Sequence, residues 1–326
     1  MEQQAALYPL RFQPIFRRYL WGGRRLESVL QKKIGPGNDY AESWEIVDHG
    51  TDQSVVAEGP LAGTTLRELN RRFGSELSGS SHTYDSFPLL FKFLDANQKL
   101  SVQVHPNDVQ AAQQQPPDFG KTEAWFVVHA DPGSIVYAGL RPGIDREDLL
   151  REIHEGTMER CMHQFEPRAG DCIFIPAGVV HALGAGLVIA EIQESSDTTF
   201  RLFDWNRLGP DGKPRALHVE QAMNVIDFDR GPVSPQRPLP TGSSCVKRLV
   251  ECGHFIWDRW DFSDTQQIGG DGRSHILAVV SGAVHVSRDP SQRPLSRGQT
   301  MLLPASLGIV SLAAAEPTVL LDAYVP

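Results

Sequence analysis

The chain has 326 residues, 40% of them hydrophobic and 22% charged, which is an ordinary composition for a globular protein long enough to form two domains. Its net charge of −9 argues against nucleic acids and anionic membranes as main partners, although a few local basic residues can still hold a small anion. No apolar run reaches the roughly 18–20 residues of a membrane helix, the first twelve residues lack signal-peptide features, and the four cysteines show no CxxC pairing. We therefore expect a cytoplasmic protein without a disulfide framework.

The pattern along the chain predicts short strands with a few helices between them. The 29 glycines and 23 prolines favour the many turns of a β-rich fold. Residues 42–47 alternate polar and apolar side chains as a half-buried strand does, and residues 61–77 contain an amphipathic helix with a threonine cap. Residues 87–94 and 100–104 are predicted to be paired strands joined by a polar turn at 95–98. Further strands are predicted at 123–128 and 134–139, and further helices at 144–155 and 217–228.

The stretch from 170 to 207 combines strand signals with unusual charge. Residues 172–175 are apolar and are followed by the turn sequence Pro176-Ala177-Gly178, so we predict a strand, a tight turn and a second strand. His181 follows the turn and is expected to point into the space that the strands enclose. The second half carries more charge than a buried strand tolerates without a functional reason, in Glu191, Gln193, Glu194, Asp197 and Arg201.

A second copy of this pattern lies near the C-terminus. Gly170 and Pro176 enclose five mainly apolar residues, as do Gly298 and Pro304, but the position that matches His181 is Ile309. Residues 231–244 contain four prolines and are predicted to be a linker. We therefore expect a catalytic domain at 1–230 with short helical insertions, and a domain at 245–326 that is similar in fold but lacks metal ligands.

The spacing of Gly170, Pro176, Gly178 and His181 matches the second motif of the cupin superfamily in full. The predicted fold class is accordingly mainly β, with two cupin (jelly-roll) barrels and a few short helices. Gln103 and His105 share one face of a strand end, and Glu123 begins the next strong strand. With His181 they offer two imidazoles, a carboxylate and an amide, a donor set that suits Zn²⁺ and can leave a position for water or substrate.

The chain resembles the type I mannose-6-phosphate isomerases, particularly their short bacterial form. The resemblance covers about the first 230 residues in order, is highly specific, and weakens in the C-terminal domain. It is carried by Trp21-Gly22-Gly23, Glu42-Ser43-Trp44-Glu45, Leu90-Phe91-Lys92, Leu100-Ser101-Val102-Gln103-Val104-His105-Pro106, Gly120-Lys121-Thr122-Glu123, Pro176-Ala177-Gly178, His181-Ala182, Glu191-Ile192-Gln193, Ser196-Asp197, Thr199-Phe200-Arg201, Asp204-Trp205, Lys213-Pro214-Arg215 and Ile226-Asp227-Phe228.

This resemblance implies a zinc-dependent enzyme that interconverts mannose 6-phosphate and fructose 6-phosphate through a cis-enediol. It implies one zinc ion per chain, a sugar phosphate as the small-molecule partner, and Gln103, His105, Glu123 and His181 as the zinc ligands. The residues expected to bind substrate are Lys92 and Ser101, facing the phosphate, and Glu194. The residues expected to act in catalysis are Arg201, which suits an oxyanion or phosphate, Lys121, which can move a proton between sugar oxygens or open the ring, and Asp197.

Several alternatives stay open at this point. Asp197 and Glu194 are both candidates for the general base, and either could instead pair with Arg201 as a structural carboxylate. Longer family members have His-Lys-Pro-Glu where this chain has Gly120-Lys121-Thr122-Glu123, so a role of that histidine does not transfer. Two histidines and a carboxylate would also suit Fe(II) in a cupin oxygenase, and a non-catalytic sugar-binding cupin is a third reading.

Overall fold

Two antiparallel sheets face each other in the N-terminal part of the chain. The computed structural model describes residues 6–79, 86–209 and 212–326. One of these sheets has six strands, in the order β12 (Cys172–Ile175), β9 (Glu123–Ala130), β14 (Leu187–Glu194), β7 (Leu89–Ala96), β3 (Tyr40–Ile46) and β2 (Ile15–Gly23). The other has five, in the order β11 (Met162–Phe165), β10 (Val136–Leu140), β13 (His181–Leu183), β8 (Val102–Val104) and β15 (Phe200–Phe203).

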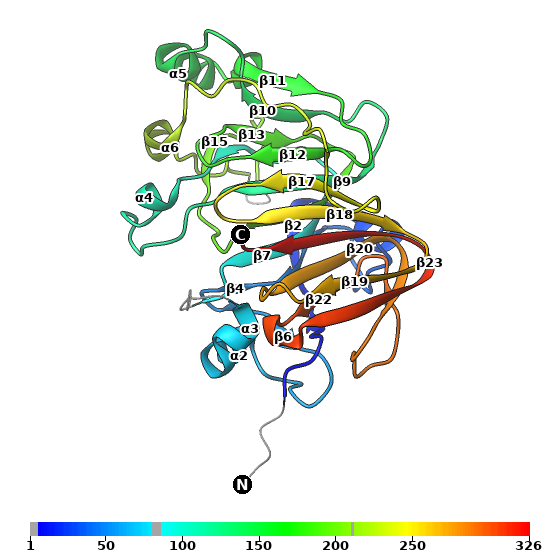
Figure 1. Ribbon diagram of the computed structural model, residues 1–326. Coiled ribbons are helices and arrows are strands. Elements are labelled where there is room, and N and C mark those ends of the chain that lie inside the picture. The colour runs from blue at the N-terminus through cyan, green and yellow to red at the C-terminus, as the bar shows by residue number, and fades with distance from the viewer. Residues whose placement is uncertain (1–5, 80–85, 210–211) are drawn as a thin grey trace.

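The C-terminal strands form a third sheet, drawn in yellow to red in Figure 1. Its order is β16 (Leu239–Pro240), β17 (Val246–Glu251), β18 (Ile256–Phe262), β23 (Ile309–Tyr324), β20 (His275–Val286) and β21 (Leu295–Ser296), with β19 (Thr265–Gly269) on β23 and β22 (Thr300–Leu303) on β20. The strands β20 and β23 are long enough to take part in both halves of this sheet. Side chains from the two halves, such as Leu277 and Val310, pack into one cluster. The sheet therefore folds over on itself.

Short elements complete the described part of the chain. Two small strand pairs join β1 (Phe12–Gln13) to β6 (Val55–Val56) and β4 (Asp48–His49) to β5 (Asp52–Gln53). The helices are α1 (Arg25–Ser28), α2 (Leu66–Phe73), α3 (Ser75–Ser78), α4 (Asp108–Ala111), α5 (Arg146–His154) and α6 (Val219–Val225), with 3-10 turns η1 (Met158–Cys161) and η2 (Ala305–Leu307). The mainly β fold class with a few short helices is confirmed. The facing pair of sheets and the folded third sheet are the two β units that were predicted as barrels.

The layers of the molecule follow from the alternation of side chains along the strands. On β14, Val188, Ala190 and Ile192 pack with residues of the C-terminal sheet such as Trp257, whereas Leu187 and Ile189 face the five-stranded sheet. The outer face of the five-stranded sheet packs against α5, η1 and α6. The six-stranded sheet is thus buried on both faces, which explains why β14 and β7 are buried at every position.

One strand pairing predicted from the sequence is wrong. The strand at 87–94 corresponds to β7, which pairs with β14 and β3, and the strand at 100–104 corresponds to β8, which pairs with β13 and β15. The turn between them carries the chain from one facing sheet to the other. The turn at Pro176–Gly178 does the same, since β12 and β13 also lie in different sheets. A local polar turn does not reveal whether the chain reverses within a sheet or crosses to the next.

Other predicted elements are confirmed. The predicted helices correspond to α2, α5 and α6, and the threonine cap is Thr65, whose hydroxyl accepts a hydrogen bond from the Glu68 amide while the Glu68 carboxylate accepts one from the Thr65 amide. Both copies of the repeat have a glycine with positive φ, a four-residue strand and a second strand, which begins at His181 in one copy and at Ile309 in the other. His181 is buried, whereas Ile309 is 57% exposed.

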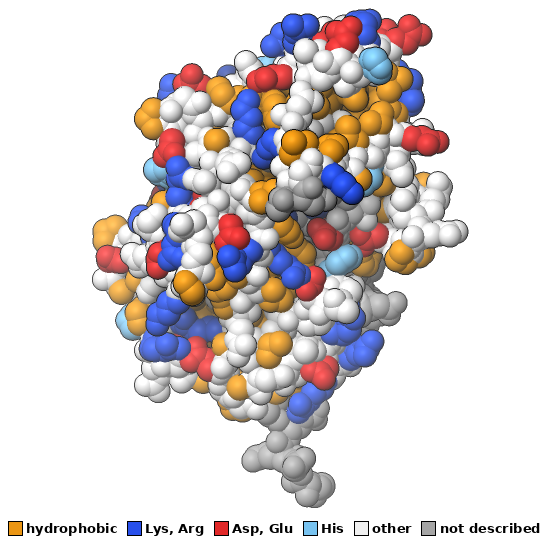
Figure 2. All heavy atoms as spheres, turned by 180° about the vertical axis from the view of Figure 1, so that it is seen from behind, with side chains coloured by type: hydrophobic (Ala, Val, Ile, Leu, Met, Phe, Trp, Pro, Cys, Tyr) orange, Lys and Arg blue, Asp and Glu red, His pale blue; other side chains and the backbone are white. Residues whose placement is uncertain are grey.

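The predicted linker lies against the facing sheets. The amide of Val233 donates to the carbonyl of Ala138, and the amide of Gln236 donates to that of Cys172. The domain limits at 1–230, 231–244 and 245–326 stay a prediction. Among the described residues, no helix is long and apolar enough to cross a membrane, and on the face shown in Figure 2 basic and acidic side chains are interspersed.

Candidate active site

A cavity of about 330 Å³ opens between the two facing sheets. The six-stranded sheet contributes Glu42, Lys92, Glu123, Trp125 and Glu191 to its wall, and the five-stranded sheet contributes Gln103, His181 and Arg201. These side chains point inward because they occupy alternate positions on strands whose other positions pack into the hydrophobic layers.

Three potential metal ligands meet at this cavity. One ligand atom each of His105, Glu123 and His181 lies within 4.8 Å of the other two, and all three side chains are buried. The Glu123 carboxylate lies 3.5 Å from His105 Nε2 and 3.3 Å from His181 Nε2. The Gln103 amide lies 3.3 Å from His181 Nε2. The four predicted ligands are therefore brought together, from β8 and the residue that follows it, β9 and β13.

Backbone contacts orient both histidines for binding a cation. His105 Nδ1 lies 2.9 Å from the carbonyl oxygen of Thr198, and His181 Nδ1 lies 2.9 Å from that of Val179. A carbonyl oxygen only accepts hydrogen bonds, so Nδ1 carries the proton in each ring and Nε2 presents its lone pair to the cluster. Burial, with the positive charge of Lys121 adding to it, holds the pKa of His105 well below its usual value and lowers that of His181 to about 3.

The ligand atoms already face a positive charge. Lys121 Nζ lies 2.5 Å from the Glu123 carboxylate and 3.0 Å from His105 Nε2. A neutral imidazole and a carboxylate thus converge on an ammonium group, which shows that this point of the cavity suits a cation. The donor set of two imidazoles, one carboxylate and one amide fits a zinc ion. His105 itself does not line the cavity, whereas Lys121, Glu123 and His181 do.

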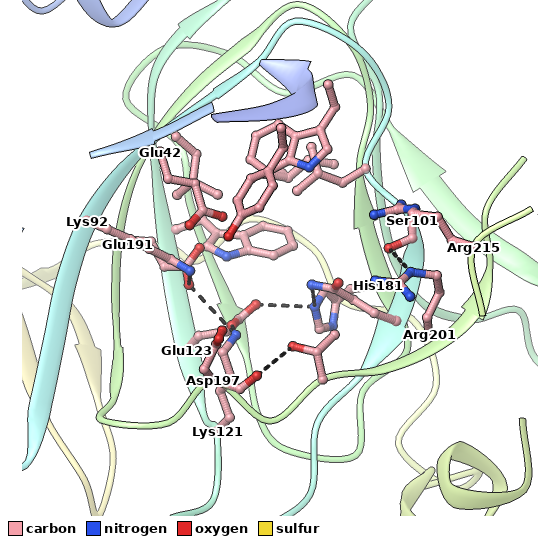
Figure 3. A pocket seen from close by; sticks show the side chains of 18 residues that line it. Glu42, Lys92, Ser101, Lys121, Glu123, His181, Glu191, Asp197, Arg201 and Arg215 are labelled. Atoms are coloured by element: carbon pink, nitrogen blue, oxygen red, sulfur yellow. Dashed lines mark hydrogen bonds and ion pairs between the residues drawn. The ribbon is translucent and has the colours of Figure 1, made fainter. Parts of the chain in front are cut away.

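A second charged group occupies the left side of the cavity in Figure 3, where Glu42, Lys92 and Glu191 are labelled. Lys92 Nζ lies 3.2 Å from the Glu191 carboxylate, and both side chains are buried. Burial opposes the charge of Lys92, but Glu191, Glu42 and Glu123 outweigh it and raise the pKa of this lysine. Burial also raises the pKa of Glu191, an effect that Lys92 counteracts. Lys92 is therefore a cation held among carboxylates.

The opposite side of the cavity is cationic. Figure 3 shows Ser101, Arg201 and Arg215 grouped on the right, with His181, Glu123 and Lys121 between the two sides. Arg201 Nε donates to Ser101 Oγ over 3.3 Å and Nη1 to the carbonyl of Ala216. Burial, together with the charges of Arg215 and Arg207, lowers the pKa of Arg201. This side of the cavity therefore has an excess of positive charge that would favour an anion.

Eight of the ten predicted site residues line the cavity, and two, His105 and Glu194, do not. The cavity wall includes Lys92, Ser101, Gln103, Lys121, Glu123, His181, Asp197 and Arg201. Glu194 points elsewhere: its carboxylate accepts a hydrogen bond from the Thr122 amide and lies 3.0 Å from His254. Arg201 pairs with neither Asp197 nor Glu194 among the described contacts. The nearby carboxylate of Asp204 pairs instead with Arg207 at 2.5 Å and with Arg215 at 2.6 Å.

Several cavity residues were not assigned a role from the sequence. They include Glu42, Glu191, Arg215 and the aromatic residues Tyr19, Trp21 and Trp125. Glu191 did carry a signal, because a carboxylate inside a fully buried strand needs a partner, and that partner is Lys92. Glu42 lies in a segment that carries the family resemblance, but a polar residue in an alternating strand does not by itself indicate a cavity, so its position at the wall is visible only in the structure.

Comparison with known proteins identifies the family. A family model described as the catalytic domain of type I phosphomannose isomerase matches residues 9–124. Mannose-6-phosphate isomerase ManA of Bacillus subtilis (strain 168) is 33% identical over 307 residues, covering 92% of this chain and 94% of that relative. The chain belongs to the type I phosphomannose isomerase family. Mannose-6-phosphate isomerase of Streptococcus mutans is also 33% identical, with 92% of this chain and 93% of that relative covered.

Solved structures agree with this family. The crystal structure of the mannose 6-phosphate isomerase from Bacillus subtilis superposes with a TM-score of 0.88 at 28% identity, covering 97% of this chain and 99% of that chain. A mutant of phosphomannose isomerase from Salmonella typhimurium has a TM-score of 0.77 at 16% identity and covers 98% of this chain and 99% of its own, which shows a shared fold. The resemblance stated from the sequence is thus confirmed at the level of the family, and the similarity extends over the C-terminal sheet as well.

Proposed function

We propose that this protein is a zinc-dependent aldose–ketose isomerase that interconverts mannose 6-phosphate and fructose 6-phosphate through a cis-enediol, with one zinc ion per chain. The observation that carries the proposal is the buried group of His105, Glu123 and His181 at a cavity between the facing sheets of a phosphomannose isomerase family member. Zinc, when bound, would polarise the sugar carbonyl and hydroxyl oxygens. Its ligands would be these three residues and Gln103.

The phosphate would bind on the cationic side of the cavity. Ser101 supplies a hydroxyl there, and Arg201 and Arg215 supply guanidinium groups, which match a phosphate well. The role of phosphate ligand inferred for Lys92 from the family is less favourable, because its ammonium is surrounded by Glu191 and Glu42. In this arrangement Lys92 faces the sugar from the opposite side.

Proton transfer between C1 and C2 requires a base and an acid within hydrogen-bond reach of the sugar. Lys121 lies beside the ligand Glu123 and lines the cavity, so its ammonium could donate to a sugar oxygen and take the proton back. Asp197 is exposed at the cavity wall, which makes its carboxylate accessible to substrate and supports it as the base. Glu194 is not supported in either role because its carboxylate faces Thr122 and His254.

A coupled isomerase assay tests this function. The purified protein is stripped with a chelator, supplied with Zn²⁺, and assayed with mannose 6-phosphate. We expect turnover in the zinc-supplied sample and almost none in the stripped sample. A zinc-supplied protein that binds the metal but does not produce fructose 6-phosphate would contradict the proposal.

The position of the phosphate has its own test. Arg201→Met removes a charged hydrogen-bond donor worth about 1.5–3 kcal/mol, so kcat/KM should fall by about 10- to 100-fold. The matched control is Arg168→Met, which changes an arginine outside the cavity. Equal kcat/KM in Arg201→Met and the wild type would exclude Arg201 from the phosphate site.

A further inference from the structure

The segment that carries Lys121 and the ligand Glu123 is held by its backbone. The amide of Gly120 donates to Asp108 Oδ1 over 3.0 Å, and the amide of Thr122 donates to Glu194 Oε2 over 2.8 Å. The amide between them, that of Lys121, donates to the carbonyl of Pro106 over 3.0 Å. Two carboxylates from different parts of the chain therefore fix the backbone on either side of Lys121.

One residue of the C-terminal sheet faces both of these carboxylates. His254 lies in the turn between β17 and β18, and its Nδ1 is 3.0 Å from Glu194 Oε1 and 3.9 Å from Asp108 Oδ2. The oxygens that face His254 are not those that accept from the backbone amides of Thr122 and Gly120. Each carboxylate thus bridges the histidine and one end of the segment.

We propose that His254 is a positioning residue for the isomerase reaction, which holds Glu194 and thereby fixes the backbone of Thr122 between Lys121 and Glu123. Only the expected effect on turnover rests on the proposed function, since the contacts of His254 do not depend on it. The Glu194 carboxylate is buried, and a buried carboxylate that loses its charged partner tends to turn toward water. Its bond to the Thr122 amide then weakens.

Charge and geometry support this role. The hydrogen bond to Glu194 raises the pKa of His254 and outweighs the partial burial of the ring, so its protonated form is favoured. Lys121 and Glu123 flank Thr122 directly, so a shift of the Thr122 backbone moves both. Since a displacement of about 1 Å in a catalytic group can reduce the rate by about 100-fold, a small relaxation of the segment is sufficient to affect turnover.

His254→Ala and His254→Asn test the proposal in the full-length protein, with His285→Ala as the matched control. Asn places its amide nitrogen where the histidine has Nδ1, so it can still donate to Glu194. His285 is an exposed histidine on β20 of the same sheet. For the zinc-loaded wild type and variants, kcat and KM are measured with mannose 6-phosphate. Hydrogen exchange of the peptide that contains residues 120–123 is followed by mass spectrometry.

We expect His254→Ala to lower kcat at least about tenfold with little change in KM, and to accelerate exchange at residues 120–123 while the rest of the chain keeps its protection. His254→Asn should recover most of the turnover and protection, and His285→Ala should match the wild type. Unchanged kcat and exchange in His254→Ala would overturn the proposal. The proposal would also be overturned if the wild type bound a second zinc ion per chain and His254→Ala lost it, because His254 would then be a metal ligand.

The two proposals fail in different ways. A wild-type protein without isomerase activity would contradict the proposed function, whereas the exchange measurement would still report whether His254 holds the segment. If His254→Ala does not fold, the comparison of His254→Asn with His285→Ala decides the question, since Asn should then keep exchange and turnover near wild type. A folded His254→Asn with unprotected residues 120–123 would contradict the role of the hydrogen bond.

Discussion

Lys92 illustrates how a single side chain can hold several buried charges in place. Its ammonium pairs with Glu191 and is further stabilised by Glu42 and Glu123. Charges of this kind are costly to bury, and the loss of one partner leaves the others uncompensated. The free energy of unfolding of a Lys92 variant therefore reports on this role separately from any role of Lys92 in substrate binding.

Lys92→Met should lower the free energy of unfolding by about 3–5 kcal/mol, because it leaves buried carboxylates without their cation. Urea denaturation measures this effect. Lys99→Met is the matched control: the side chain of Lys99 is 42% exposed and pairs with Glu159, so its replacement should change stability by less than about 1 kcal/mol. Equal stability of the two variants would show that the Lys92 cluster does not carry this energy.

The two buried histidines predict a pH dependence of the metal-free protein. Their pKa values are lowered from 6.5, to about 3 for His181 and in the same direction for His105. Below pH 6.5 the unfolded chain therefore binds protons that the folded chain does not, and stability falls as the pH falls toward 3. Each histidine contributes up to about 1.4 kcal/mol per pH unit.

His181→Gln isolates this contribution, since glutamine does not titrate. Between pH 6.5 and 4 the metal-free wild type should lose up to about 3 kcal/mol more stability than the variant. Denaturant unfolding at several pH values gives the difference. A constant difference across this range would mean that His181 titrates alike in the folded and unfolded chains.

At the scale of single elements, the two copies of the glycine-strand-proline pattern share a fold but differ in surroundings. Gly170 and Gly298 both have positive φ, at +94° and +75°. A Cβ on Gly298 would lie 2.1 Å from the carbonyl oxygen of Leu30, whereas one on Gly170 would meet only the end of the Arg259 side chain at 3.3 Å. Gly298 thus allows the N-terminal part of the chain to approach the C-terminal sheet closely.

Alanine at these two glycines should have unequal effects. Gly170→Ala should lower the free energy of unfolding by about 1–2 kcal/mol through backbone strain alone. Gly298→Ala should lower it by about 1–3 kcal/mol more, because the backbone of Leu30 must move as well. Thermal or denaturant unfolding of the two variants compares them directly. An equal loss would indicate that the close approach to Leu30 relaxes freely.

The elements also show what could be predicted from the sequence. Periodicity and turn residues were sufficient for β9, β10, β12 and the three longest helices, because these signals are local. They were not sufficient to assign β7 and β8 to different sheets, since a turn within a sheet and a crossing between sheets use the same residues.

The candidate site likewise contains residues that could be predicted from the sequence and residues that could not. Gln103, His105, Glu123 and His181 lie in recognisable motifs, and the structure brings them together. Glu42 and Arg215 lie in segments that carry the family resemblance, but their place in the cavity is visible only in the structure, as is the contact of His254 with Glu194. Glu194 was expected near the substrate because it lies in the charged second half of the 170–207 stretch, but it is three positions from Glu191 on β14 and therefore faces the opposite side of the strand.

On the scale of the whole molecule, the C-terminal sheet supports the site without lining its cavity. Phe91, Phe93 and Phe126 of the six-stranded sheet share a core with Trp257 and Ile276 of the C-terminal sheet. The strands that hold Lys92, Glu123 and Glu191 are therefore packed from behind over a large apolar surface, which limits their movement. His254 adds a polar contact from the same sheet to the segment beside the ligands.

The most direct test of this account is a titration of the metal-free protein with Zn²⁺, in which bound zinc per chain and isomerase activity with mannose 6-phosphate are measured on the same samples. Activity should rise in proportion to bound zinc and reach its maximum at one ion per chain. Glu123→Gln should bind the metal at least about 100-fold more weakly and show correspondingly little activity at low zinc. Full activity in the metal-free wild type, or tight zinc binding that leaves the protein inactive, would contradict the account.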